Sequence, residues 1–151
     1  MSDTVRIINE LLVELFNDIL TIEATSLKNT GLKDLSVTEM HVIEAIGLSP
    51  RTMTDVASQL GITVGTLTIS INRLVKKEYV TRSRSEEDRR FVNIELTRKG
   101  KIAYRTHQSF HDGMVRYMIE ELSDEDNEVL VASLKRLNDF LKERYHLSKK
   151  Q

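Results

Sequence analysis

The chain has no cysteine, no tryptophan and a single proline among its 151 residues. Without thiols it can form neither disulfides nor thiolate metal sites, and it cannot sense redox state through a thiol. Aromatic residues make up only 5% of the sequence, and so few helix breakers and aromatics favour a mostly helical fold. No apolar run approaches the length of a bilayer span, and no basic-then-apolar leader is recognisable, so we expect a cytoplasmic protein.

Motifs that carry catalysis are lacking as well. The sequence contains no HExxH zinc motif, no glycine-rich phosphate loop and no arrangement typical of a nucleophile with its base. A chain of this length forms one domain, or one domain with a dimerisation appendage. We therefore expect a binding protein that is not an enzyme and that needs no resident cofactor.

Charge is distributed unevenly along the chain. Residues 49–105 carry 12 Lys and Arg against 6 Asp and Glu, whereas the remainder carries 10 against 17. The net charge of −1 hides this asymmetry. A basic middle between acidic ends is expected when one lobe meets phosphates and the others do not.

Residues 52–77 predict a helix-turn-helix. Thr52 would cap the first helix, Ala57 would allow the two helices to cross closely, and Gly61 would supply the turn, where a positive φ is easiest for glycine. The apolar positions expected between the two helices are Val56, Leu60, Ile62, Leu67, Ile71 and Leu74.

Small and polar residues dominate the expected outer face of the second helix, at Thr63, Gly65, Thr66, Thr68, Ser70, Asn72 and Arg73. Short side chains let a helix enter the major groove of DNA deeply, and Asn and Arg can bond to base edges. A solvated face explains the same positions. The weak helix propensity of Thr and Ser favours the groove-facing interpretation.

Two predicted strands, residues 79–84 and 91–96, flank a charged tip at residues 85–90. The tip could be an ordinary solvated turn. As the wing of a winged helix-turn-helix, it would place an arginine in the narrow minor groove, where the negative potential attracts cations. The residues expected to act there are Arg84, Asp88, Arg89 and Arg90, with Asp88 orienting a neighbouring arginine through a bidentate pair.

Long apolar stripes mark the helices predicted on either side of this lobe. They cover residues 4–29, 98–121 and the segment after Ser123, and a capping box at Ser36 and Glu39 predicts one more helix. Either an intrachain core or a second subunit could cover these stripes, and their breadth favours a dimer. We expect dimerisation helices in residues 1–35 and 106–151, a DNA-binding lobe in residues 36–105, and fraying of Lys149-Lys150-Gln151.

Residues 88–100, read as DRRFVNIELTRKG, resemble the wing signature of the MarR family, and the resemblance extends over nearly the whole chain. It implies a mostly α (α+β) winged helix-turn-helix whose N- and C-terminal helices form a helical dimerisation domain. It also implies a homodimer that binds double-stranded DNA at a pseudo-palindromic operator, usually as a repressor. The arginine that enters the minor groove in the family falls on Arg90.

Shorter stretches are similar to one subgroup, the fatty-acid-synthesis repressors of Gram-positive bacteria. They include residues 7–10, 22–23, 39–41, 65–68, 84–90 and 107–111. This resemblance implies control of fatty-acid biosynthesis genes, with long-chain acyl-acyl carrier protein as corepressor. An acyl chain needs an apolar pocket with adaptable lining, for which the candidates are Phe16, Leu20, Glu23, Met40, His41, Ile43, His107, Phe110, His111 and Met114. Core packing explains their apolar members equally well. Lys101 and Arg105 are candidates for docking the acidic carrier protein.

Other functions remain open at this point. His107 and His111 are four residues apart on one predicted helix face, and zinc-sensing members of the family draw ligands from similar places, so Glu23, His41, His107 and His111 are an alternative zinc site. The same residues could form a hydrogen-bonded polar cluster. A small aromatic or phenolic effector is a further alternative, and a winged-helix module for protein contacts is the alternative without DNA.

Overall fold

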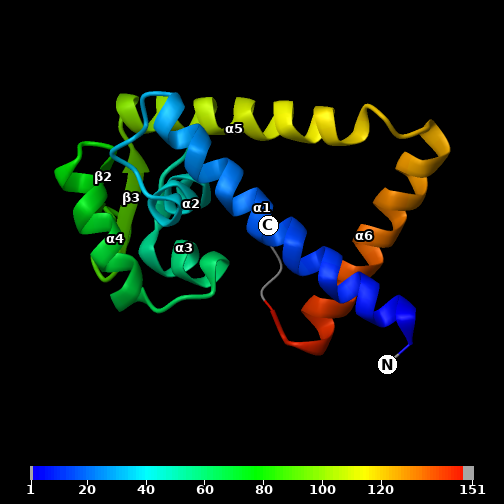
Figure 1. The fold of residues 1–151 in the computed structure, drawn as a ribbon. Helices are drawn as coiled ribbons and strands as arrows, with labels where there is room; N and C mark the ends of the chain where they lie inside the picture. Colours follow the sequence, from blue (N-terminus) through cyan, green and yellow to red (C-terminus); the bar gives the residue numbers. More distant parts are fainter. Residues whose placement is uncertain (1, 148–151) are drawn as a thin grey trace. The chain divides into compact units, whose positions relative to one another are not determined.

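A computed structural model describes residues 2–147 of the chain (Figure 1). It contains two compact units, Met1–His41 and Val42–Gln151. The predicted fraying of Lys149-Lys150-Gln151 concerns positions outside the described residues. Within residues 2–147, no helix is both long enough and apolar enough to cross a membrane.

The first unit is built on one long helix, α1, at Asp3–Asn29. Ser2 caps it by accepting a hydrogen bond from the Val5 amide, at 3.4 Å. The helix ends at Thr30, and Gly31 follows with a φ of 78°, the left-handed conformation that commonly stops a helix. The sequence predicted this helix to within one residue at its start.

The capping box predicted at Ser36 and Glu39 is present. The Glu39 amide donates to Ser36 Oγ at 3.1 Å, and the Ser36 amide donates to the Glu39 carboxylate at 3.0 Å. Two otherwise unsatisfied amides at the start of α2, Val37–Ile46, are thereby paired. Gly47 ends α2 with a φ of 70°.

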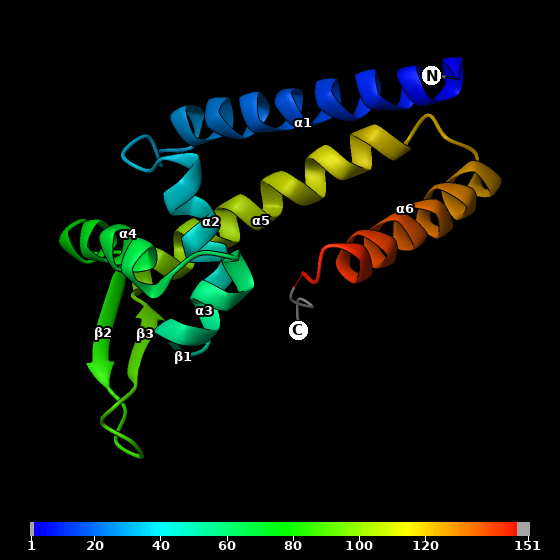
Figure 2. The same ribbon diagram turned by 90° about the horizontal axis from the view of Figure 1, so that it is seen from below.

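The second unit carries the remaining elements: β1 (Arg51–Thr52), α3 (Met53–Leu60), α4 (Val64–Lys76), β2 (Val80–Arg84), β3 (Val92–Leu96), α5 (Arg98–Ile119) and α6 (Asp124–Arg144). The strands form one antiparallel sheet in the order β1-β3-β2. Helices α3 and α4 followed by the β2–β3 hairpin make the expected winged helix-turn-helix. In Figure 2 the hairpin extends away from α4 as a projecting ribbon.

The core of this unit uses most of the positions expected from the sequence. Val56, Leu67, Ile71 and Leu74 are buried between α3 and α4, while Leu60 is only half-buried. The prediction for Ile62 is wrong, because this residue is exposed. It follows Gly61 directly in the turn, and there its backbone amide, not its side chain, serves the structure by donating to the Ala57 carbonyl at 3.1 Å.

The strands start one residue later than predicted, and the sequence did not predict β1. Only two residues form β1, and they pair Arg51 with Ile94 and Thr52 with Asn93. A strand of two residues has no hydrophobic periodicity, so its existence depends on the partner strand. In β3, the predicted alternation holds in part: Ile94 and Leu96 are buried and Glu95 between them is half-exposed, but Val92 at the start of the strand is also half-exposed.

The start of α5 packs on the turn between α4 and β2. Thr97 caps α5 and donates its hydroxyl to the Glu78 carbonyl at 2.7 Å, while its amide donates to the Tyr79 carbonyl at 3.0 Å. Gly100 approaches the same turn so closely that a Cβ at this position would collide with the Tyr79 carbonyl oxygen. A residue without a side chain is therefore required at Gly100.

We expect Gly100→Ala to destabilise the protein by about 1–3 kcal/mol or more, because the new methyl group must displace backbone at Tyr79. The measurement is urea unfolding followed by circular dichroism. Gly113→Ala is the matched control, since Gly113 lies in the middle of α5 and a Cβ there has nothing within 4 Å. That change should be neutral or stabilising, by up to about 1 kcal/mol. Equal stability of the two variants would refute the close packing at Gly100.

Candidate nucleic-acid interface

Helix α4 is held at its start by a tight turn from α3. Gly61 adopts a φ of 67° and its amide donates to the Ser58 carbonyl at 3.2 Å, completing a common helix stop. Thr63 then caps α4 by accepting from the Thr66 amide at 3.1 Å. The two hydroxyls lie 2.9 Å apart. The direction of α4 is thus defined by local hydrogen bonds of the turn and of the Thr63 side chain.

Most residues expected on the outer face of α4 are exposed, namely Thr63, Gly65, Thr66, Asn72 and Arg73. Thr68 and Ser70 are only half-exposed, and Thr68 donates its hydroxyl to the Val64 carbonyl at 2.8 Å. These two are less available to a ligand than predicted. Ile69 was not among the residues predicted on this face, yet it is 57% exposed between the two exposed clusters of α4. Its departure from the buried spacing of Leu67, Ile71 and Leu74 was the available signal.

The wing tip is ordered by an aspartate-arginine pair, as predicted. Arg90 Nε donates to both oxygens of Asp88, at 3.0 and 3.1 Å, and Arg90 Nη2 lies 2.6 Å from Asp88 Oδ2. The Arg90 amide also donates to Asp88 Oδ1, at 3.1 Å. The Arg90 side chain is nevertheless 86% exposed. It is therefore oriented from one side and remains open to a ligand on the other.

This pairing shifts both ionisation equilibria. The side-chain hydrogen bond from Arg90, and then the backbone hydrogen bond, lower the pKa of Asp88 below its ordinary value. The same side-chain hydrogen bond raises the pKa of Arg90. Both groups are therefore charged at neutral pH. Because the folded pKa of Asp88 is lowered, its stabilising effect is complete above the ordinary aspartate pKa and is lost as pH falls through the lowered value.

Two further arginines lie along β2. Arg84 Nη1 donates to the Arg89 carbonyl at 3.1 Å, so Arg84 supports the tip from the strand below it. Arg82 Nη1 donates to Asn72 Oδ1 at 2.6 Å and so links the wing to α4. Arg82 was missing from the residues predicted from the sequence. The alternation of β2, in which Arg82 shares a face with Arg84, was the signal that could have indicated it.

The predicted effector and zinc residues divide between the two units. In the first unit, His41 Nε2 lies 3.2 Å from Glu23 Oε2, and the Glu23 side chain is buried while that of His41 is partly exposed. Met40 of this unit is fully buried, Leu20 is half-buried and Phe16 is 64% exposed. Phe16 is too exposed in this single chain to line an enclosed pocket.

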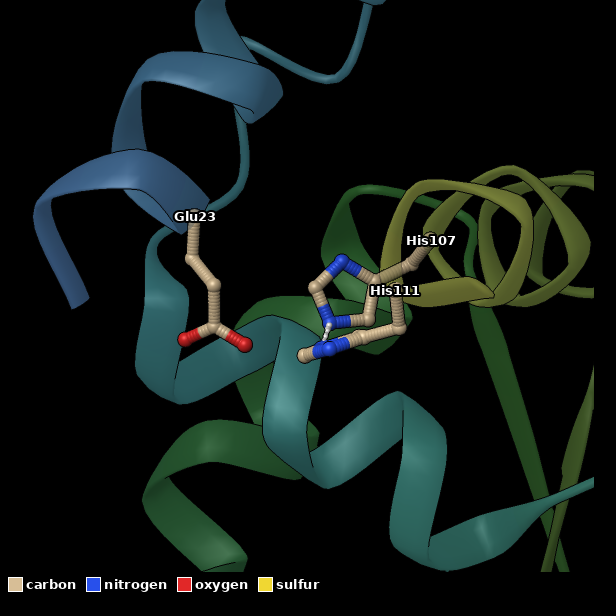
Figure 3. A group of neighbouring side chains, drawn as sticks. All are labelled: Glu23, His107 and His111. Atoms are coloured by element: carbon tan, nitrogen blue, oxygen red, sulfur yellow. Dashed lines mark hydrogen bonds between the residues drawn. The ribbon is translucent and has the colours of Figure 1, made fainter. Parts of the chain in front are cut away.

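In the second unit, the histidines of α5 adjoin a carboxylate of α2. His107 Nε2 and His111 Nε2 are 3.0 Å apart, as the dashed line in Figure 3 marks. Glu44 Oε1 lies 3.6 Å from His107 Nε2 and 4.0 Å from His111 Nε2. Glu44 was not among the predicted residues, although it lies three residues after His41 on the same helix. Phe110 packs against both rings, with centroid distances of 5.9 and 5.4 Å.

The remaining members of the predicted effector set are Ile43, which is fully buried, and Met114, which is half-buried. A core role accounts for Ile43 without a ligand. Partial exposure of Met114 and Phe110 leaves apolar surface on α5 near the histidine pair. The acyl-chain pocket therefore stays a prediction.

Comparison with known proteins decides the family. The sequence model of the MarR family matches residues 33–90. The chain is 41% identical to FabT of Streptococcus pneumoniae, solved in complex with DNA, with a TM-score of 0.88 over 92% of this chain and 98% of that chain. The chain belongs to the MarR family. The resemblance seen in residues 88–100 and the predicted fold class are thus confirmed.

Curated relatives agree with this assignment. The chain is 30% identical over 89 residues to the HTH-type transcriptional regulator YpoP of Bacillus subtilis, covering 58% of this chain and 61% of YpoP. It is 31% identical over 87 residues to the HTH-type transcriptional repressor YetL of the same organism, covering 58% of this chain and 50% of YetL. As a MarR-family protein, the chain is a DNA-binding transcriptional regulator and not an enzyme.

The Asp88–Arg90 pair makes a prediction about acid titration. The Asp88 carboxyl carbon, followed by NMR, should titrate with a midpoint below that of an ordinary aspartate. In Arg90→Gln the midpoint should rise toward the ordinary value, because the side-chain hydrogen bond is removed. Arg89→Gln is the control and should leave it unchanged. An Asp88 midpoint that does not respond to Arg90→Gln would contradict the pair.

Proposed function

We propose that this MarR-family regulator is a homodimeric repressor of fatty-acid biosynthesis genes, with long-chain acyl-acyl carrier protein as its corepressor. The observation that carries the proposal is the 41% identity to FabT over 98% of that chain. FabT was solved in complex with DNA. The subgroup motifs in residues 65–68, 84–90 and 107–111 support the same regulon.

The DNA-contacting surface would combine α4 and the wing. Thr63, Gly65, Thr66, Asn72 and Arg73 present short or donor-rich groups on one exposed helix face, which suits the major groove. Thr52, the cap of α3, and the half-exposed Thr68 and Ser70 would add contacts at its edges. Arg84, Asp88, Arg89 and Arg90 would form the minor-groove element, with Arg90 as the inserted side chain.

A second copy of the chain would cover the exposed apolar faces. In α1, the side chains of Leu11, Leu12 and Phe16 are 51%, 56% and 64% exposed. Among the described residues of α6, none is buried, and Leu134 and Phe140 are 54% and 59% exposed. So much apolar surface on several helices is unusual for a monomer. In the dimer, the two α4 helices would lie about 34 Å apart, one turn of DNA.

Arg90→Ala should weaken operator binding. It should also lower the slope of log association constant against log salt concentration by about one, because one cation near the DNA phosphates is lost. Gel shifts on the fragment upstream of the protein's own gene, over a salt series, measure both quantities. Lys33→Ala, which removes an exposed cation outside the DNA-binding lobe, is the control. Unchanged affinity of Arg90→Ala at moderate salt would reject the wing assignment.

The docking of the acidic carrier protein would use the basic side of α5. Arg105 is exposed there, whereas Lys101 lies 3.6 Å from Glu95 Oε1 and is partly neutralised by it. Arg105 is therefore the stronger docking candidate. The acyl chain would contact Phe110 and Met114, whose partial exposure leaves apolar surface on the same helix.

Zinc is the second candidate effector, and the histidine pair is the observation that favours it. Two imidazole nitrogens bound to one tetrahedral zinc ion lie about 3.4 Å apart, since each Zn–N bond is about 2.0–2.1 Å. The Nε2 atoms of His107 and His111 are 3.0 Å apart, with Glu44 Oε1 nearby, so these side chains fit a zinc ion with little movement. The alternative site predicted from the sequence also names Glu23 and His41, which belong to the first unit.

Gel shifts repeated with each candidate effector distinguish the acyl-acyl carrier protein from zinc. Long-chain acyl-acyl carrier protein should tighten operator binding of the wild type, and the unacylated carrier protein should not. Arg105→Glu should reduce this effect while leaving binding without corepressor close to the wild-type value. Tightening by zinc that chelator reverses, together with no response to the acylated carrier, would reject the acyl corepressor in favour of the metal.

A further inference from the structure

Arg82 is the link between the two parts of the DNA-binding surface. It occupies the middle of β2, opposite Ile94 of β3, and shares a strand face with Val80, which is buried. From this position its guanidinium reaches α4 and donates to Asn72 Oδ1 at 2.6 Å. Both side chains are exposed. The bond therefore lies on the surface that the proposed function turns toward DNA.

The chemistry of this bond decides how the Asn72 amide is oriented. A guanidinium has donors only, so the amide atom that faces it must be the carbonyl oxygen. The short distance is typical of a charge-assisted hydrogen bond, which is stronger than one between neutral groups. The amide nitrogen of Asn72, with its two N–H donors, is then directed away from Arg82.

We propose that Arg82 is a positioning residue for base recognition, which holds Asn72 so that it presents N–H donors to the major groove. The proposal rests on the proposed DNA-binding function. An asparagine that reads adenine bidentately must accept from the adenine amino group through its carbonyl oxygen. Here Arg82 takes one of the two lone pairs of that oxygen, so a single acceptor site is left for a base, whereas the amide nitrogen carries two N–H donors. Guanine offers two acceptors in the groove, N7 and O6, so Asn72 should favour guanine over adenine at the base pair it meets.

A positioning role differs measurably from a phosphate contact. A cation that only meets phosphate weakens binding to every sequence alike and lowers the salt slope by about one when removed. A residue that orients Asn72 changes the base preference at one base pair in each half-site. The base pair affected must also be the one that responds to Asn72 itself.

The experiment selects binding sequences from a randomised duplex library with the wild type, Arg82→Met, Asn72→Ala and the double variant. Arg82→Met removes the donor and the charge but keeps an unbranched apolar stem. We expect a loss of guanine preference, about fivefold or more, at the same base pair in both single variants. The double variant should match Asn72→Ala at that position, because Arg82 acts there through Asn72.

Arg73→Ala is the matched control, since it removes the exposed arginine next to Asn72 on α4. It should lower affinity without changing the preference at that base pair. The Arg82 role is overturned if Arg82→Met weakens all sequences alike and keeps the preference, a result that leaves the repressor proposal standing. If the wild type enriches no sequence at all, the DNA-binding function and the Arg82 role both fail. Thermal unfolding shows whether the variants are folded. Arg82→Met and Asn72→Ala should keep a melting temperature close to that of the wild type, because both side chains are exposed.

Discussion

The backbone contact between Gly100 and the turn after α4 is the constraint on which the DNA-binding lobe depends. The turn contains Glu78 with a φ of 65°, a conformation that is costly for a residue with a side chain. Thr97 donates to the Glu78 carbonyl, and Lys99 Nζ donates to the Lys77 carbonyl at 2.8 Å. One small region thus joins the end of α4, the start of β2, the end of β3 and the start of α5. A shift there would move α4 and the wing relative to each other.

On this base, the surface of the lobe is organised by arginines that are held on one side and open on the other. Arg90 is oriented by Asp88 at the wing tip, and Arg82 connects β2 to Asn72. Holding a long side chain in one orientation before binding reduces the conformational entropy lost on association. Acidic residues in the wing are therefore compatible with a DNA-binding role. The carboxylate of Asp88 directs a cation and does not simply oppose phosphate.

The residues proposed for sensing lie in a different part of the chain. Glu23, beside His41 in the first unit, and His107, beside His111 and Glu44 in the second, are buried polar groups. Groups of this kind cost free energy to bury and need bonds to one another or to a ligand. These groups lie on α1, α2 and α5, outside the helix-turn-helix and wing. The proposed regulation would therefore use other residues than the proposed DNA contact.

Sequence alone determined the elements whose signals are local. These elements are the capping box at Ser36, the cap at Thr52, the glycine turn at Gly61 and the apolar stripes. Each depends on residues within a few positions of one another. The wing signature in residues 88–100 also identified the family, because its aspartate-arginine pair and strand are contiguous.

Only the tertiary structure decided which distant groups meet. Some features arise between separate segments of the chain: the strand β1, the bond from Arg82 to Asn72 and the approach of Glu44 to the histidines of α5. Others, the exposure of Ile62 and Ile69, arise from the packing around these residues. The need for glycine at position 100 has the same origin. Its cause is a carbonyl oxygen that lies 21 residues earlier in the chain, at Tyr79. Periodicity reports which face of an element is apolar, but it does not report which atoms of another element lie against that face.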